Sequence, residues 1–219
     1  MSKRYVTGPI ASLHRPTVIQ VDQLCVQYAQ QSILHNVSFA VYDPQAVAIL
    51  CKTRLQKALL LACLQGVMYA HEGTITLLST RMPPMSLTLQ QQIGVVVPTL
   101  PRQQQTVDEY IWAATRSTTS SINKQVNTYI ARYGLCSTDM LKHLTLLQSR
   151  LLALAVALLP DPPLVIFDDP LLNLALAERT IFEQHMARLR REGRTILVLG
   201  TYPLAAEQVS MYDSIVNIE

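Results

Sequence analysis

The chain has 219 residues, which is enough for one large α/β domain or two small ones with a buried core. Hydrophobic residues make up 49% of the sequence, yet no stretch approaches the roughly 18 apolar residues of a spanning helix, so the chain is not expected to cross a membrane on its own. A scattered net charge of +3 argues against nucleic-acid binding, and the four cysteines have no metal-ligand spacing.

The beginning of the chain is predicted to contain a tail, a hairpin and a buried strand. The first 16 residues lack the apolar segment of a secretory signal and are expected to form a flexible tail. Val18–Tyr28 and Ile33–Tyr42 alternate apolar with polar residues, and the short turn between them favours an antiparallel hairpin. The apolar run Val47–Leu50 predicts a strand buried on both faces. The cysteines are expected to be reduced thiols of a cytosolic protein.

The segment Ala46–Leu61, AVAILCKTRLQKALLL, has the layout of a phosphate-binding loop. A short apolar strand is followed by a six-residue loop and then by a helix that is predicted to begin at Lys57. The pattern G-x-x-x-x-G-K-[ST] aligns with Cys51, four intervening residues, Gln56, Lys57 and Ala58. Of the four fixed positions, only the lysine is the same in this sequence. The segment has no glycine, although glycines normally let the backbone approach a phosphate.

The rest of the chain alternates buried strands with helices. Further strands are predicted at residues 71–79, Ile93–Val97, Leu164–Phe167, Thr195–Leu199 and Ser214–Ile218. Helices are predicted at Lys57–Met68, Leu87–Gln92, parts of Thr106–Leu141, Leu144–Leu159 and Glu178–Glu192. This order is typical of an α/β fold whose mostly parallel sheet is covered by helices on both faces. At the carboxyl edge of that sheet, three loops are expected to meet, namely those at Cys51, at Asp168-Asp169 and at Thr201-Tyr202.

The order of these segments resembles the nucleotide-binding domain of an ATP-binding cassette (ABC) transporter, over residues 18–219. A strand that ends in Tyr28, a turn and the motif ILHNVSF precede the phosphate loop, and HEGTIT follows the first helix. LVIFDDP resembles the Walker B strand of that family, and residues 190–219 resemble its closing helix–strand–switch–helix–strand segment. Five segments in one order make the resemblance specific to the family.

The resemblance implies an architecture, ligands and partners. It implies a P-loop NTPase-like sheet, an antiparallel β subdomain and an inserted helical subdomain at about residues 99–159, all within one domain over residues 17–219. The implied ligands are ATP and Mg²⁺. The implied partners are a transmembrane permease and a second nucleotide-binding subunit, either another chain or a second copy, at the cytosolic face of the cell membrane. Nucleic acid is not an expected partner.

The resemblance assigns a role to each matching residue. Tyr28 would stack on adenine, Arg54 and Lys57 would contact phosphate, and Asp168 would hold Mg²⁺ through water. Asp169 stands where the family has the glutamate that orients the attacking water, and it is about 1.5 Å shorter, a misplacement that can cost about 10²-fold in rate. Lys57 is explained equally well as a solvated lysine at a helix start, and Asp169 as a cap of the following turn.

Other motif positions depart from the family pattern. In the signature segment, Thr145 and Gln148 match LSGGQ, whereas Leu146 and Leu147 replace its two glycines. Tyr202 stands at the position of the switch histidine. Further departures are Ala58 for the Mg²⁺-binding hydroxyl, Pro98 or Thr99 for the loop glutamine, and Ala175 for a dimer-contact aspartate.

Three functions remain open at the level of the sequence. The favoured one is a degenerate cassette subunit, or pseudo-ATPase, with a structural or regulatory role beside a permease and little or no ATP hydrolysis. The alternative is an active ATPase subunit that powers transport through Lys57, Asp168 and Asp169. A third interpretation is a subunit that binds ATP without hydrolysing it.

Overall fold

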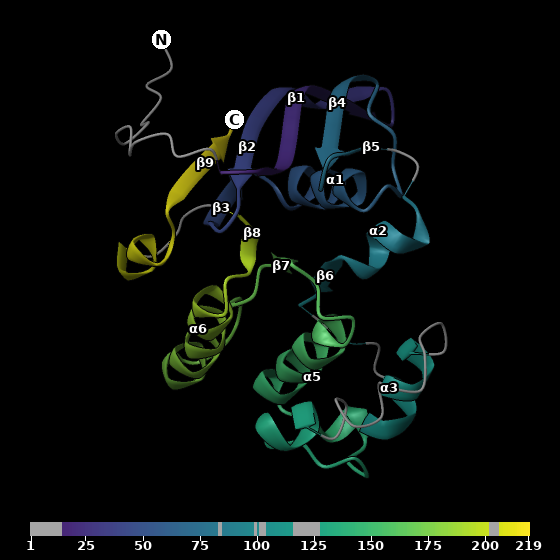
Figure 1. Cartoon of the computed structure of the whole chain (residues 1–219), viewed down its shortest axis with the longest axis vertical. Helices are drawn as coiled ribbons and strands as arrows, with labels where there is room; N and C mark the ends of the chain where they lie inside the picture. The colour runs from purple at the N-terminus through teal and green to yellow at the C-terminus, as the bar shows by residue number, and fades with distance from the viewer. Residues whose placement is uncertain (1–14, 83–84, 99, 101–103, 116–127, 202–205) are drawn as a thin grey trace.

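Figure 1 shows the computed structural model of the chain, which describes residues 15–82, 85–98, 100, 104–115, 128–201 and 206–219. Within these residues, a parallel sheet has the strand order β6-β7-β8-β3-β9. Its strands are β3 (Ala46–Cys51), β6 (Ile93–Val96), β7 (Leu164–Asp168), β8 (Thr195–Thr201) and β9 (Ser214–Ile218). All neighbouring strands in this sheet pair in parallel, which confirms the predicted sheet type.

A second sheet is antiparallel and has the order β2-β1-β4-β5. Its strands are β1 (Thr17–Tyr28), β2 (Gln31–Tyr42), β4 (Glu72–Leu77) and β5 (Thr80–Met82). The pairing of β1 with β2 confirms the predicted hairpin, and β4 adds to the other edge of β1. Strand β5 was not predicted, because its three residues are too few to show an alternating pattern.

Helices lie on both faces of the parallel sheet, as Figure 1 shows, with α1 on the side of the antiparallel sheet and α5 and α6 on the other side. The α-helices are α1 (Arg54–Leu64), α2 (Leu87–Gln91), α3 (Val107–Thr115), α5 (Leu146–Leu158) and α6 (Leu176–Arg191). Residues 128–132 are also helical, and two 3₁₀ segments are η1 (Leu141–His143) and η2 (Ala206–Met211). None of the helices in the described part of the chain is long and apolar enough to cross a membrane.

The parallel sheet separates two hydrophobic cores, because successive side chains of a strand point to opposite faces. In β7, Leu164 and Ile166 belong to the core shared with α1 and the antiparallel sheet, while Val165 and Phe167 belong to the core beneath α5 and α6. Strand β8 divides in the same way. A strand buried on both faces therefore appears in the sequence as a continuous apolar run, which is how these strands were predicted.

The start of α1 differs from its prediction. The helix begins at Arg54 and ends at Leu64, whereas the sequence pattern predicted Lys57–Met68. The early start follows from Thr53, whose extended backbone and side chain cap the helix. The early end follows from Gly66, which has φ +68° and turns the chain away from the helical path. Only Lys52 and Thr53 separate β3 from α1, so the expected six-residue loop does not form.

Candidate functional site

The first turn of α1 satisfies its own backbone. Thr53 Oγ1 accepts a hydrogen bond from the backbone N–H of Gln56 at 3.1 Å, and Gln56 Oε1 accepts one from the backbone N–H of Thr53 at 3.1 Å. These reciprocal bonds form a capping box. The Gln56 side chain is buried and also donates to the carbonyl oxygen of Ile33 at 3.3 Å. The donors that a phosphate-binding helix would offer to an anion are therefore partly used by side chains of the same turn.

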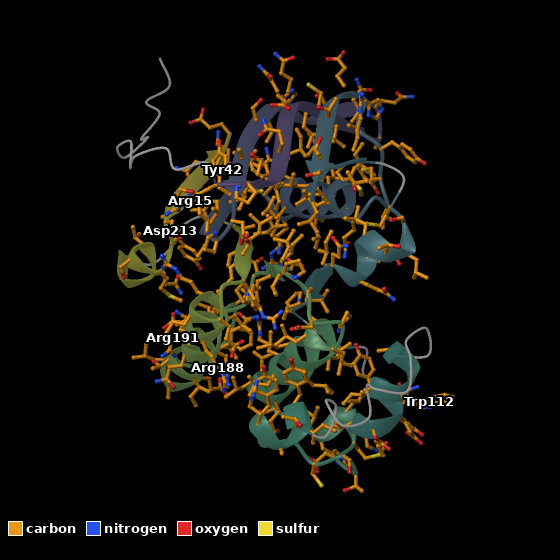
Figure 2. All side chains as sticks on the ribbon, viewed as in Figure 1. Arg15, Tyr42, Trp112, Arg188, Arg191 and Asp213 are labelled. Carbon is orange, nitrogen blue, oxygen red and sulfur yellow. The ribbon has the colours of Figure 1, made fainter. Side chains whose placement is uncertain are left out.

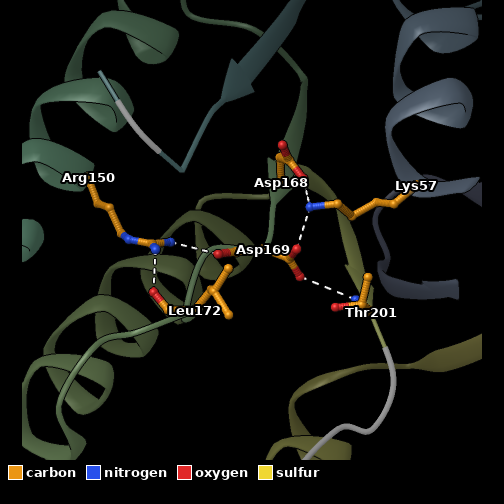
Figure 3. Close-up of polar contacts among 6 residues, drawn as sticks. All are labelled: Lys57, Arg150, Asp168, Asp169, Leu172 and Thr201. Atoms are coloured by element: carbon orange, nitrogen blue, oxygen red, sulfur yellow. Dashed lines mark hydrogen bonds and ion pairs between the residues drawn. The ribbon is translucent and has the colours of Figure 1, made fainter. Parts of the chain in front are cut away.

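Lys57 lies between two carboxylates at the end of β7, those of Asp168 and Asp169. Its Nζ forms ion pairs with Asp168 and Asp169, and the contact with Asp169 is also a hydrogen bond (Figure 3). The three side chains are only 9%, 16% and 10% exposed, respectively. Burial by itself lowers the pKa of Lys57, but its contacts with the two carboxylates and their charges outweigh burial and raise that pKa above its ordinary value. Lys57 therefore stays positively charged here and is not a solvated lysine.

Asp169 is held by two other elements besides α1, namely β8 and α5. Its backbone N–H donates to the carbonyl oxygen of Leu199 at 2.8 Å, and its carboxylate accepts from the backbone N–H of Thr201 at 3.3 Å. Its carbonyl oxygen accepts from Arg150 of α5 at 2.6 Å. Asp169 has φ +41°, a region that aspartate enters more readily than most residues. This network orients the carboxylate toward Lys57 and β8, so Asp169 does more than cap the next turn.

Arg150 is a buried cation that the sequence interpretation did not single out. It is 2% exposed and donates to two backbone carbonyls, those of Asp169 and Leu172 (Figure 3). Burial lowers its pKa, and the nearby carboxylates of Asp168 and Asp169 oppose that effect. A signal was available in the sequence, because Arg150 is the one charged residue in the apolar run LTLLQSRLLALAVALL. An arginine in such a run indicates a buried polar contact.

The structure brings together the three predicted strand ends. Lys57 lies in α1 after β3, Asp168 ends β7, Asp169 follows it, and Thr201 ends β8. All four residues belong to one connected group. Tyr202, predicted at the switch position, lies outside the described residues, as does Thr99. Cys51 is buried and ends β3 close to this group, and burial raises the pKa of its thiol to about 12, so the thiol is neutral at neutral pH.

The other predicted nucleotide contacts lie apart from this group. Tyr28 ends β1 and is 51% exposed, and Arg54 is an exposed residue at the start of α1. Neither is joined to Lys57 by an ion pair or hydrogen bond among the described residues. Their predicted contacts with adenine and phosphate therefore remain predictions.

The start of α5 repeats the device found at the start of α1. Thr145 Oγ1 accepts from the backbone N–H of Gln148 at 3.2 Å, and Gln148 Oε1 accepts from the backbone N–H of Thr145 at 2.9 Å. The two signature residues that match the family thus cap each other. The spacing Thr-x-x-Gln is the sequence pattern of a capping box, and it occurs at both Thr53 and Thr145. That pattern could have placed both helix starts from the sequence.

A small cavity borders the carboxylate of Asp169 on the side away from α1. Its volume is about 180 Å³, below the 300–1,000 Å³ that is usual for a small-molecule site. Its lining includes Gly200 of β8, Arg179 of α6 and Tyr212, which follows η2. Among the described residues, no cluster of three or more His, Cys, Asp or Glu side chains is arranged to hold a metal ion. The cavity as it stands is too small for a nucleotide.

Comparison with known proteins identifies the family. The model of the ABC transporter family matches residues 34–172, which is more than half of the chain. The chain belongs to the ABC transporter family. Its fold is similar to that of an ATP-binding cassette of an ABC transporter in its ADP conformation, with a TM-score of 0.81 and 14% identity over 93% of this chain and 87% of the other. It is likewise similar to cbiO1 from Clostridium perfringens, with a TM-score of 0.79 and 17% identity over 93% and 85% of the two chains.

Curated relatives of this family member are longer proteins. The Nod factor export ATP-binding protein I of Mesorhizobium japonicum is 25% identical over 191 residues, which cover 83% of this chain and 55% of the relative. The ribose import ATP-binding protein RbsA of Caldanaerobacter subterraneus is 23% identical over 196 residues, which cover 84% of this chain and 39% of the relative. The chain thus spans roughly two fifths to one half of these relatives.

Proposed function

We propose that this ABC-family chain is a pseudo-ATPase, a nucleotide-binding-domain subunit with a structural or regulatory role in a transport complex and little or no ATP hydrolysis. The observation that carries the proposal is the group formed by Lys57, Asp168 and Asp169, in which the residues expected to contact phosphate and Mg²⁺ contact one another. Lys57 is already paired with both carboxylates, and its charge offsets part of their combined negative charge. An incoming nucleotide would have to separate them.

The charges of this group disfavour nucleotide entry. If Lys57 turned to a phosphate, Asp168 and Asp169 would lose the cation that pairs with both of them. Removing one partner from a buried ion pair costs on the order of 3–5 kcal/mol. A bound Mg²⁺ would have to supply the missing positive charge. Asp168 could serve as one of its ligands, but the usual hydroxyl ligand is missing because Ala58 follows Lys57.

The backbone at the start of α1 also supports the proposal. Two residues, Lys52 and Thr53, replace an extended phosphate loop, and the capping box of Thr53 and Gln56 occupies donors at the helix start. A phosphate would compete with these bonds and meet the side chains that replace glycine. The residues present therefore do not fit ATP and Mg²⁺ in the arrangement that the family resemblance implies.

The proposed partners follow from the family. We infer that the chain pairs with a membrane permease, at the cytosolic face of the membrane, and with another cassette subunit or a second copy of itself. We further propose the division into a tail of residues 1–16, a domain over residues 17–219 and a helical subdomain at about residues 99–159. The names of the relatives include both an exporter and an importer, so they favour neither direction of transport.

A nucleotide-binding measurement tests the proposal. The purified chain is expected to show no change in melting temperature and no heat of binding with millimolar MgATP. The variants Lys57→Ala and Lys52→Ala provide a matched pair, because Lys52 is exposed and lies beside the same helix start. A MgATP-dependent rise in melting temperature that is lost in Lys57→Ala and kept in Lys52→Ala would contradict the proposal.

An active ATPase is the second candidate. It is favoured by the meeting of Lys57, Asp168 and Asp169 at the carboxyl edge of a parallel sheet, which is where ligands bind in such folds. Phosphate release by the chain together with its co-purifying subunits tests this function. Hydrolysis that falls at least 100-fold in Asp169→Asn would favour the active enzyme, whereas release that is unchanged in that variant would assign the activity to a partner. ATP binding without hydrolysis would favour the third interpretation.

A further inference from the structure

A second cavity, larger than the one beside Asp169, lies away from the Lys57 group. It has a volume of about 520 Å³, within the 300–1,000 Å³ that is usual for small-molecule sites. Its walls come from the C-terminal half of α6, from the starts of β3 and β8, and from η2 with the residue that follows it. These strand starts lie at the opposite edge of the parallel sheet from Asp168 and Asp169, so the cavity is separate from the site described above.

The floor of this cavity is apolar. Met186 and Ile196 are 3% and 2% exposed and lie at its base, and Met211 and Tyr212 form a partly buried wall. Methionine side chains are flexible and polarizable and adapt to the shape of an apolar ligand. Burial raises the pKa of Tyr212 to about 12, so this wall carries no charge at neutral pH. The floor is suited to an apolar chain or ring.

The rim of the cavity is basic. The last turn of α6 carries Arg188, Arg190 and Arg191, and Arg190 and Arg191 line the cavity. Arg190 is paired with Asp213, and Arg188 with Glu192. Arg191 is exposed and forms no ion pair among the described residues; its Nε donates to the carbonyl oxygen of Ala187 at 3.4 Å. Figure 2 shows Arg188 and Arg191 on α6 and Asp213 nearer β9. One guanidinium at the mouth is thus left to pair with an anion.

We infer that this cavity is a binding site for an amphipathic carboxylate, with the apolar body against Met186, Ile196 and Met211 and the carboxylate paired with Arg191. The guanidinium is suited to this role, because its planar donors match the two oxygens of a carboxylate. Tyr212 also lines the smaller cavity beside Asp169, so the two cavities share a wall. A ligand in the larger cavity would therefore contact the same residue that borders the Lys57 group.

Calorimetric titration of the full chain with decanoate below its micelle concentration tests the site. Decanol serves as a probe without the charge, and acetate as a probe without the apolar body. Saturable binding of decanoate, at least tenfold tighter than that of decanol and with no binding of acetate, is expected. Absence of saturable decanoate binding would overturn the inference.

Two pairs of variants locate the binding. Arg191→Gln is expected to weaken decanoate at least tenfold and leave decanol unchanged, whereas Arg188→Gln, which removes a paired arginine outside the cavity lining, should change neither. Ala187→Leu fills the cavity from an exposed helix position and should abolish binding of both probes, whereas Ala177→Leu on the same helix should not. Melting temperatures of all four variants report folding. Decanoate binding that survives Ala187→Leu, or that falls equally in Arg188→Gln, would overturn the inference.

Discussion

Helices α1 and α5 begin with the same local device in two different surroundings. Each has a threonine N-cap and a glutamine three residues later, Thr53 with Gln56 and Thr145 with Gln148. At α1, Gln56 is buried and the next residue, Lys57, is an ion-pair partner of two carboxylates. At α5, Gln148 is only partly buried and its cap is a local contact, although Thr53 and Thr145 are both exposed. The same four-residue pattern therefore fixes a helix start in both places, while the packing around it decides how much the cap contributes to stability.

Both helices also contact one residue, Asp169, in different ways. Lys57 of α1 neutralises its carboxylate, whereas Arg150 of α5 donates to its carbonyl oxygen. A carboxylate without its cation keeps a full charge in a buried site, but a carbonyl without its donor loses only a hydrogen bond. We therefore expect the α1 contact to matter more for stability, and four predictions test this order.

The largest effect is expected from Lys57→Ala. This substitution leaves Asp168 and Asp169 buried without their cation, and should lower the free energy of unfolding by about 3–5 kcal/mol at pH 7. Urea denaturation followed by circular dichroism measures the change. Lys52→Ala, which removes an exposed lysine, should cost less than about 0.5 kcal/mol. A loss below 1 kcal/mol for Lys57→Ala would show that the group is solvated and not a buried ion pair.

Arg150→Met should have the next largest effect, a loss of about 2–3 kcal/mol, because the carbonyl oxygens of Asp169 and Leu172 each lose a part-buried hydrogen bond while the volume of the side chain is largely kept. The same urea titration measures it. Lys57→Ala and Arg150→Met share Asp169 and should not be additive, with an interaction energy of about 0.5 kcal/mol or more. Strict additivity would mean that the two helices do not act through one residue.

The two capping threonines should have smaller and unequal effects. Thr53→Ala is expected to cost about 1–2 kcal/mol and Thr145→Ala about 0.5–1 kcal/mol, because the partner of the first cap, Gln56, is buried whereas Gln148 is only partly buried. Combined with Lys57→Ala, the Thr53 variant should be non-additive, whereas the Thr145 variant should add within about 0.5 kcal/mol. Equal costs and equal coupling would remove the distinction between the two helix starts.

The last prediction concerns alkaline pH, where the free energy of unfolding should fall. At neutral pH this effect is the smallest of the four. The pKa of Cys51 is raised to about 12 in the folded chain from an ordinary value of 9.0, and that of Lys57 is also raised. A raised folded-state pKa contributes stability that is complete below the unfolded value and is lost as the pH rises through the folded value. Unfolding free energy should therefore fall from pH 9 toward pH 12, and more slowly in Cys51→Ala. The slope due to Cys51 should not exceed about 1.4 kcal/mol per pH unit. A wild-type curve that is flat between pH 9 and 11 would contradict this account.

Much of the fold could be predicted from the sequence. The runs at Val47–Leu50 and Leu164–Phe167 are apolar without interruption, as strands buried on both faces must be, and both form strands of the parallel sheet. The predicted hairpin forms, and the predicted short helix at Leu87–Gln92 is α2. The predicted start of α1 was wrong because the prediction followed the phosphate-loop overlay. The local pattern Thr53-x-x-Gln56 decides where this helix begins.

The candidate site, too, could be predicted only in part from the sequence. The sequence by itself determined which residues follow each strand, and therefore that Lys57, Asp168 and Asp169 would lie at one edge of the sheet. Only the tertiary structure decided that these charges pair with one another and that Arg150 reaches the backbone of Asp169 from another helix. The physical reason is the separation along the chain over which each interaction acts. Hydrophobic periodicity and capping act within a few residues, whereas Arg150 and Lys57 contact Asp169 from 19 and 112 positions away. Burial and distances that only the packed chain defines select these contacts.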